Sequence, residues 1–301
     1  MAGGQERLLR RRIRSVNSTR KTTRAMELIA GSRIVRAQQR IVAARPYAES
    51  LDRLAADIAS VPGGLDHPLL GEPEAGSGVA VVVIAGDRGL SGAYNANVLR
   101  RAESVISGHR RRGVPVEVLA VGRRAQSYLR FRGSRIDHLF TGLTDRPLYS
   151  DAASVAADIL AAFEQGRIGS AGVVSTRFRS MGLQSVESRR LLPLEVGEGT
   201  PFDYETEPER GELLELLMPR LIESRLFLAL LEATASEHAA RQRAMKAATD
   251  NADELIRNLR RIMNRARQDA ITTEIMDIVG GAEALRQAAG NPLPPLPEHA
   301  A

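Results

Sequence analysis

The stretch MKAATDNADELIRNLRRIMNRA, residues Met245–Ala266, decides the architecture of this 301-residue chain. Its apolar residues recur at alternating intervals of three and four: Met245, Ala248, Ala252, Leu255, Leu259, Ile262 and Ala266. This spacing is the heptad seam of a helix that packs along a second helix. We therefore expect a long helix over about Glu209–Leu285, with Pro219 in its first turn or at a kink near its start.

The N-terminal part of the chain predicts the second helix, over about Gln5–Ile58. Its seam comprises Ala30, Ile34, Ala37, Ile41, Ala44, Ala48, Leu51, Ala55 and Ile58. Leu9, Ile13 and Val16 keep the same rhythm, and Arg20 and Glu27 interrupt it. Pro46 removes a backbone donor and is expected to bend the helix. The Pro- and Gly-rich stretch VPGGLDHPLLGEPEAGSG, residues 61–78, then ends it.

Between the two helices the hydrophobic period changes. The run VAVVVIA, residues 79–85, is typical of a strand buried on both faces. Further strands are expected at 116–121, 173–179 and 185–194, and helices at 94–113, 123–131 and 150–163, the last capped by Ser150 or Asp151. This alternation predicts an open, mostly parallel, Rossmann-like α/β sheet with right-handed crossovers.

The predicted organisation is an N-terminal coiled-coil helix (1–60), a linker (61–78), the α/β domain (79–208), a second coiled-coil helix (209–286) and a disordered tail (287–301). The helices should measure roughly 80 and 110 Å, whereas such a domain is about 30 to 40 Å across. We therefore expect the helices to pair with each other, antiparallel. The first helix would run out near Ile262, leaving about twenty residues of the second without cover.

The uncovered end of the second helix is apolar on more than one face. Its apolar residues are Ala270, Ile271, Ile275, Met276, Ile278, Val279, Ala282 and Leu285. A lone helix of this kind needs a surrounding partner in water. The alternative is that this end folds back onto the α/β domain.

Composition excludes several classes of chemistry. The chain has no cysteine, so thiolate metal sites, a Cys nucleophile and disulfides are excluded. The five histidines are scattered, and we find no convincing acid, base and nucleophile set; no catalytic, cofactor or metal site is expected. No run is long and apolar enough to span a membrane, and the charged N-terminus does not resemble a signal peptide. We expect a mature cytosolic protein.

The loop GDRGLSGAYN, Gly86–Asn95, lies where phosphate-binding loops occur, between a buried strand and a helix. Its glycines match neither common phosphate-loop spacing. Glu117 lies near the start of the second strand, not at its end where a ribose-binding acid belongs. A nucleophile elbow at Ser91 fails because Ala93 replaces its second glycine. An α/β nucleotide-binding enzyme with coiled-coil arms remains an alternative.

The formal net charge is +6, and Lys21 and Lys246 are the only lysines. Arginines gather in RRRIR, residues 10–14, and along the last helix at Arg241, Arg243, Arg257, Arg260, Arg261, Arg265 and Arg267, with Lys246 among them. One interpretation is a solvated face with partners at i,i+4, such as Asp253 with Arg257. The other is a row of contacts to an acidic protein surface, or to nucleic acid. Few aromatic side chains are available for stacking on single-stranded bases.

Three segments together resemble the gamma subunit of the bacterial rotary (F-type) ATP synthase. They are IRSVNSTRKTTRAMELIAGSRI in the first helix, the loop GDRGLSGAYN, and EATASEHAARQRAMKAATDNADELI in the last helix. The ending RARQDAITTEIMDIVGGAEAL fits the family signature through Ile271, Thr272, Glu274, Asp277, Gly281, Ala282 and Ala284. Order and spacing agree over nearly the whole chain.

The resemblance implies a non-catalytic central stalk that couples proton transport to ATP synthesis. The coiled coil would turn inside a head of alpha and beta subunits, with its C-terminal tip in a hydrophobic bearing. The α/β domain would be a foot that binds the epsilon subunit and the membrane c-ring, at the cytoplasmic face of the cell membrane. Implied contacts with the head are Met26, Arg88, Ser91, Arg241, Arg267, Gln268, Thr272, Ile275 and Val279. Implied contacts of the foot are Phe202, Tyr204 and Glu205.

The sequence departs from the family pattern at two of the quoted positions. Gly31 lies in a helix interior, where glycine costs about 1 kcal/mol relative to alanine. Ser91 stands where a cysteine is frequent, and no Cys-bearing insert is present, so control by thiol oxidation is not expected.

Overall fold

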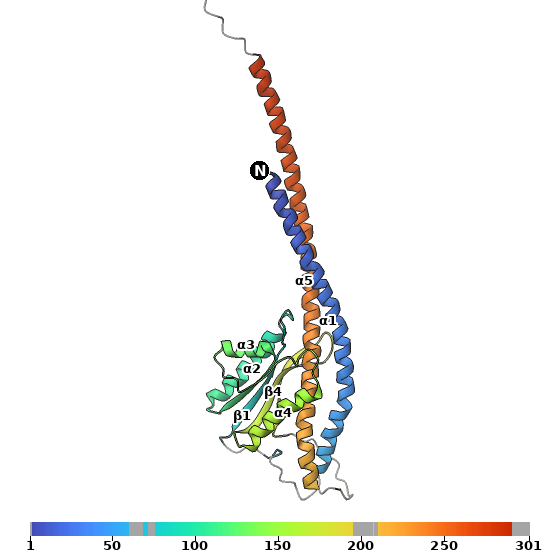
Figure 1. The fold of residues 1–301 in the computed structure, drawn as a ribbon, viewed down its shortest axis with the longest axis vertical. Coiled ribbons are helices and arrows are strands. Elements are labelled where there is room, and N and C mark those ends of the chain that lie inside the picture. Colours follow the sequence, from blue (N-terminus) through green and yellow to red (C-terminus); the bar gives the residue numbers. More distant parts are fainter. Residues whose placement is uncertain (1, 60–68, 72–75, 195–206, 208–209, 291–301) are drawn as a thin grey trace, which may run out of the picture. The chain divides into compact units, whose positions relative to one another are not determined.

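The computed structural model describes the chain except residues 1, 60–68, 72–75, 195–206, 208–209 and 291–301. The helices are α1 (Ala2–Ala59), α2 (Tyr94–Arg111), α3 (Arg123–Phe131), α4 (Tyr149–Glu164) and α5 (Arg210–Ala289). The strands are β1 (Gly78–Ile84), β2 (Val116–Val121), β3 (His138–Phe140), β4 (Ile168–Phe178) and β5 (Gln184–Leu192). Figure 1 shows these elements. The chain divides into two compact units, Ala25–Lys246 and Met1–Arg24 with Ala247–Ala301, which we describe separately.

Unit Ala25–Lys246 contains a five-stranded sheet in the order β3-β2-β1-β4-β5. The strands β3, β2, β1 and β4 are parallel, and β5 returns antiparallel to β4. Every residue of β1 is buried, as its unbroken apolar run predicted. The expected mostly parallel α/β sheet is therefore confirmed.

Each face of the sheet has its own apolar core. One face packs on α2 and α3, through residues such as Val81, Val98 and Leu129. The other face packs on α4, on the C-terminal part of α1 and on the N-terminal part of α5, through residues such as Val82, Ile159 and Leu226. Figure 1 shows α4 beside α5, and α2 with α3 on the far side of the strands. Alternate residues of β1 thus enter opposite cores, as the two-residue period of a strand requires.

The two long helices run antiparallel in both units. In unit Ala25–Lys246, Asp52 near the end of α1 pairs with Arg225 near the start of α5, at 2.8 Å. In the other unit, Arg20 pairs with Asp253 at 2.7 Å, and the hydroxyls of Thr23 and Thr249 lie 2.8 Å apart. The predicted α1 seam is confirmed, because Ala44 is half-buried and the other eight residues are buried: Ala30, Ile34, Ala37, Ile41, Ala48, Leu51, Ala55 and Ile58.

The predicted seam of α5 is partly wrong. Met245, Ala252 and Leu259 are buried as predicted, whereas Leu255 and Ile262 are 39% and 51% exposed. At the alternate positions the buried residues are Thr249 and Ile256, one residue after the predicted Ala248 and Leu255. A Thr–Thr hydrogen bond and the Arg20–Asp253 pair supply polar contacts that the apolar rhythm alone does not report.

Four smaller expectations need correction. The strand β3 was not predicted, since three residues carry too little pattern. Pro219 is not in the first turn of α5, since the helix begins at Arg210; the alternative, a kink near the start of the helix, stays a prediction. The N-cap of α4 is Leu148, and Asp151 accepts a hydrogen bond from the Leu148 amide at 2.7 Å. Asp253 bonds across the seam to Arg20, although Arg257 was its expected partner.

Gly31 lies where α1 and α5 approach closely. A Cβ atom at this position would lie 3.1 Å from the side-chain nitrogen of Gln242. That is a tight contact, but the end of a Gln side chain can move. The glycine is therefore of little benefit to the packing of α1 against α5, and it lowers the stability of the helix relative to alanine.

We predict that Gly31→Ala raises the free energy of unfolding by about 0.5 kcal/mol, because a helix-propensity gain of about 1 kcal/mol is partly offset by displacement of Gln242. In a Gln242→Ala background, the same substitution should give nearly the full gain. Urea denaturation of the four variants measures both values. Equal gains in the two backgrounds would show that Gln242 does not limit the position.

Candidate functional site

The loop that follows β1 is held by one carboxylate. The oxygens of Asp87 accept hydrogen bonds from the amides of Arg123, Gly142 and Thr144, at 3.0 to 3.3 Å, and from the Thr144 hydroxyl at 2.9 Å. The amide of Asp87 donates to the same hydroxyl at 3.0 Å. Asp87 therefore joins the loops that follow β1, β2 and β3 at the carboxyl edge of the sheet.

These bonds bear on the nucleotide-binding alternative. The start of α3 offers the amide of Arg123, which in a phosphate site would face the ligand. Here the Asp87 carboxylate takes that amide. Desolvation would raise the pKa of Asp87, but the hydrogen bonds from Gly142, Thr144 and Arg123 outweigh it and lower the pKa. The amide that would bind a phosphate is therefore occupied by the chain's own carboxylate.

A buried polar cluster joins the same loop to α5. Glu237 and Arg241 are 2% and 7% exposed and form an ion pair one helical turn apart. Arg241 also donates to the carbonyl of Gly89 at 3.4 Å and contacts Nδ1 of His238 at 3.2 Å. A Cβ atom on Gly86 would lie 2.7 Å from Oε1 of Glu237, so any other residue here would displace the Glu237 carboxylate.

Burial governs the protonation of this cluster. Desolvation raises the pKa of Glu237, although the charge of Arg241 opposes the shift. Desolvation, together with the charges of Arg241 and Arg33, lowers the pKa of His238 to about 4, so the imidazole is neutral at neutral pH. A neutral His next to a charged Arg–Glu pair has a structural role here, since His238 is 2% exposed.

The residues expected to contact a partner near this loop differ in accessibility. Arg88 is exposed and pairs with Asp145 at 3.3 Å, and Asp145 also pairs with Arg33 of α1 at 3.0 Å. Met26 is half-buried on α1. Ser91 is buried, and its hydroxyl accepts a hydrogen bond from the Asn95 amide at 3.2 Å. Arg241 is committed to Glu237 within the chain.

The residues expected to contact a partner near the end of α5 are all exposed. Arg267, Gln268 and Thr272 lie on the surface. Ile275 and Val279 are 54% and 59% exposed, and Ile271, Met276, Ile278 and Leu285 are exposed as well. No described residue covers this apolar stretch. Phe202, Tyr204 and Glu205 lie outside the described residues.

The arginines divide into two groups. Arg241 is buried, and Arg243 donates to the carbonyl of Met181 at 2.8 Å. Lys246 is exposed in the same unit, and nine arginines of the two predicted basic stretches are exposed in the other unit: Arg10, Arg11, Arg12, Arg14, Arg257, Arg260, Arg261, Arg265 and Arg267. Arg10 pairs with Glu6. This surface offers guanidinium groups to carboxylates or phosphates.

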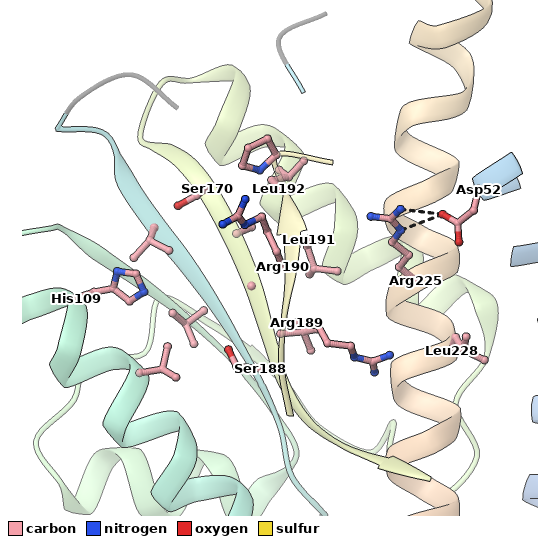
Figure 2. Close-up of a pocket in the computed structure, with 17 residues that line it drawn as sticks. Asp52, His109, Ser170, Ser188, Arg189, Arg190, Leu191, Leu192, Arg225 and Leu228 are labelled. Atoms are coloured by element: carbon pink, nitrogen blue, oxygen red, sulfur yellow. Dashed lines mark hydrogen bonds and ion pairs between the residues drawn. The ribbon is translucent and has the colours of Figure 1, made fainter. Parts of the chain in front are cut away.

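A hollow of about 1050 Å³ in unit Ala25–Lys246 lies along β4 and β5 (Figure 2). Arg225 pairs with Asp52 there, and Arg189 pairs with Glu232 at 3.2 Å. His109 and Ser188 come from different elements, and Figure 2 marks no bond between them. Among the side chains lining this hollow, no serine is hydrogen-bonded to a base, as nucleophilic catalysis requires.

The described residues contain no group of three or more His, Asp and Glu side chains arranged to hold a metal ion. None of the described helices has the length and apolarity needed to cross a bilayer.

Sequence reasoning missed Asp87, Glu237 and His238 as organising residues. The four-residue spacing of Glu237 and Arg241 is a signal for an i,i+4 pair, but it does not report burial. The fold and these surfaces define a protein that offers long helical faces to other proteins.

The comparisons identify the family. The family model described as ATP synthase matches residues 5–285. The ATP synthase gamma chain of Frankia casuarinae is 50% identical over 293 residues, covering 94% of this chain and 98% of that relative. That of Acidothermus cellulolyticus is 49% identical over 294 residues, with 94% and 98% covered. The chain belongs to the ATP synthase gamma-chain family.

A solved structure shares the fold. A chain in the cryo-EM structure of the Euglena gracilis mitochondrial ATP synthase, with OSCP, F1 and c-ring in rotational state 3, superposes with a TM-score of 0.70. The sequence identity is 17%, and the match covers 99% of this chain and 100% of that chain. A chain of the Tetrahymena thermophila central stalk and c-ring gives a TM-score of 0.57 at 20% identity, covering 75% of this chain and 99% of that one.

We predict that Asp87→Asn lowers the free energy of unfolding by about 2 kcal/mol at pH 7, because an amide cannot accept from all four donors. The folded-state pKa of Asp87 is lowered, so its stabilisation is complete above the ordinary value of about 3.9 and is lost as the pH falls through the folded-state value. Urea denaturation at pH 7 and pH 3 should show a smaller gap at pH 3. The exposed control Asp250→Asn should change stability by less than about 0.5 kcal/mol.

We predict that Glu237→Gln lowers the free energy of unfolding by about 3 kcal/mol, because it leaves the buried guanidinium of Arg241 without its counter-charge. The exposed residue Glu215 lies on the same helix, and Glu215→Gln should shift stability by less than about 0.5 kcal/mol. Denaturation followed by circular dichroism compares the two. Similar values for both variants would mean that the Arg241–Glu237 pair contributes no net stability.

Proposed function

We propose that this chain is the central shaft of a rotary ATP synthase, which carries rotation of a membrane ring to a catalytic head and forms no chemical bond itself. Family membership supports this function. The observation that carries it is the uncovered apolar end of α5, including Ile275 and Val279, which needs a surrounding partner in water. A head of alpha and beta subunits supplies such a partner.

The proposed mechanism is a shift of conformational populations. Each angle of an asymmetric shaft gives a different contact energy with each beta conformation, so rotation changes which conformation is favoured. To move a site from one dominant state to the other, the contacts must differ by about 5.5 kcal/mol. Exposed Arg267, Gln268 and Thr272 offer hydrogen bonds for these contacts, and Ile275 with Val279 offers apolar ones.

In this proposal, Met26 and Arg88 of unit Ala25–Lys246 also contact the head. Arg88 is exposed beside Asp145, and an acidic group of a partner can compete for its guanidinium. Ser91 and Arg241 belong to the same region. Their burial favours an indirect role, in which they hold the loop and α5 in one orientation while other residues touch the head.

The α/β domain, residues 79–208, is the proposed foot. It binds the epsilon subunit and the c-ring, with Phe202, Tyr204 and Glu205 as contact residues. The chain is then a peripheral part of a membrane complex, on the cytoplasmic face of a bacterial cell membrane. Purifying a tagged chain from its own membranes and identifying the co-purifying subunits tests both partners and location.

The rival functions predict different binding. A nucleotide-binding enzyme would bind labelled nucleotide with micromolar affinity, and mutation of Gly89 would abolish that binding. The Arg123 amide already donates to the Asp87 carboxylate, which argues against a nucleotide phosphate at this loop. A nucleic-acid-binding coiled coil would show affinity that falls steeply with salt.

We predict that a chain truncated before Ala270 keeps its α/β domain folded but loses most coupled activity, because the apolar contacts at the end of α5 are removed. Far-ultraviolet circular dichroism of the isolated chain checks folding. ATP-driven proton pumping by reconstituted membranes measures coupling. A control that lacks only residues 290–301 should pump normally. Full pumping by the shorter chain would remove the proposed bearing role.

A further inference from the structure

The ends of α2 and α3 lie at one edge of the central sheet. The strands β1, β2 and β3 are parallel, and α2 and α3 are the crossovers that connect them. Each crossover helix runs back against the strand direction, so both helices end at the edge where the strands begin. This amino edge is opposite the carboxyl edge that holds Asp87. A hydrogen bond of 3.4 Å from Arg110 to the hydroxyl of Ser134 joins the end of α2 to the loop after α3.

Six exposed arginines end or follow α2 and α3, and one phenylalanine lies among them. We call this surface the basic edge: Arg110, Arg111, Arg112, Arg130, Arg132 and Arg135, with Phe131. Arg132 pairs with Glu103, and Arg135 pairs with Asp137 at 3.0 Å. The other four arginines have no acidic partner among the described residues. All of these residues belong to unit Ala25–Lys246.

The helix dipoles account for only part of this charge. Basic side chains in the last turn of a helix offset the roughly half negative charge at its C-terminus. The last turn of α2 already contains His109, Arg110 and Arg111, and that of α3 contains Arg130. Three further arginines of the basic edge lie beyond the last residues of these helices. The excess of guanidinium groups over carboxylates therefore favours an anionic partner.

Phe131 indicates the kind of anionic partner independently of the charge. Its side chain is 85% exposed, and no large apolar side chain in the described parts of the chain is more exposed. Leu129, two residues earlier, already fills the core on this face of the sheet, so the Phe131 ring adds no packing to the fold. Arginines around an exposed aromatic ring are a combination that peripheral proteins place at the level of lipid headgroups.

Two other anionic partners fit this surface less well. Single-stranded nucleic acid stacks its bases on successive aromatic rings. Phe131 is the only exposed ring of α2 and α3, since Tyr94 is buried and Tyr128 is half-buried and donates to Glu103 at 2.6 Å. An acidic protein would need an apolar pocket among its carboxylates to cover Phe131. A bilayer interface offers phosphates and an apolar boundary together, over an area that matches the whole edge.

We propose that the basic edge binds the surface of a bilayer that contains anionic lipids. The arginines contact the lipid phosphates, and the ring of Phe131 enters the boundary between headgroups and acyl chains. The free chain is thereby concentrated at the membrane surface. Binding of vesicles by the chain alone does not require the proposed rotor function, so either proposal can fail without the other.

The first test uses fluorescence of the full chain. The sequence contains no tryptophan, so a single introduced indole reports its own surroundings. In Phe131→Trp, the emission should shift to shorter wavelength when vesicles of phosphatidylcholine and phosphatidylglycerol are added, and vesicles of phosphatidylcholine alone should cause no shift. Leu183→Trp is the matched control, because this exposed residue follows β4 at the carboxyl edge, and its emission should not change. A chain that attaches to lipid only through the apolar end of α5 would leave the Phe131→Trp emission unshifted, which overturns the proposal.

Sedimentation with the same vesicles measures the affinity. The double variant Arg111→Gln with Arg130→Gln should bind about 25-fold more weakly, because each arginine near an anionic surface contributes roughly five-fold. Phe131→Ala should weaken binding by about five-fold. The matched double variant, Arg101→Gln with Arg123→Gln, removes the same charge from exposed positions of the same helices away from the basic edge, and it should bind as the wild-type chain does. Equal losses in the two double variants would mean that net charge alone attracts the chain to lipid, and would overturn the proposal.

A last comparison separates lipid from a protein partner. Tagged wild-type chain and the Arg111→Gln, Arg130→Gln variant are purified from their own membranes, and the accompanying synthase subunits are identified. We expect the same subunits with both chains, since the proposed contact is with lipid. Loss of a subunit from the variant, with vesicle binding unchanged, would assign the basic edge to a protein and overturn the lipid site. Absence of synthase subunits from both chains would contradict the rotor function and leave the vesicle result standing.

Discussion

The packing of α5 against the central sheet is the contact on which the rest of unit Ala25–Lys246 depends. Residues from Leu214 to Ala233 enter the same apolar core as β1, α4 and the end of α1. This core removes apolar surface of α5 and of the sheet from water together, so neither can be exposed without the other. The helix is therefore anchored to the α/β domain before it reaches the polar residues that follow.

Beyond Ala233 polar contacts join the apolar ones, since Ala235 and Ala239 still share an apolar cluster with Phe178 of β4. Thr234 donates to the Thr144 carbonyl, Glu237 lies against Gly86, and Arg241 reaches the Gly89 carbonyl. Directional bonds define an orientation that apolar packing alone leaves looser. A shaft that must transmit torque needs such orientation, and a pocket enzyme does not. This polar section separates the anchored part of α5 from its exposed part.

In the exposed part of α5, apolar side chains are not packed against the rest of the chain. Ile275, Met276 and Val279, for example, remain exposed to solvent. An isolated chain gains nothing from leaving them uncovered, so their presence points to an assembled state. The surface arginines near residues 10–14 and 257–267 add charge to the same unit. Together, these apolar and basic side chains form a surface suited to contacts with partner proteins and not to packing within the chain.

Most of the architecture followed from the sequence. The α1 seam, the buried strand β1 and the alternation of strands and helices were all predictable, because hydrophobic periodicity is a local property of consecutive residues. The three-residue strand β3 was not, since its pairing with β2 depends on a neighbour in space. The exposed end of α5 was predictable from a difference in helix lengths alone.

The site was less predictable than the fold, for the same reason. Sequence by itself determined which residues are charged, which are apolar and at what spacing, and it placed Arg267 and Ile275 on one exposed helix. Only the tertiary structure decided that Ile256 and not Leu255 is buried, that Arg241 pairs with the buried Glu237, and that Asp87 bonds to the loops that follow β2 and β3. Those outcomes depend on groups distant in sequence, such as Gly86 beside Glu237, and burial arises only when the chain brings them together.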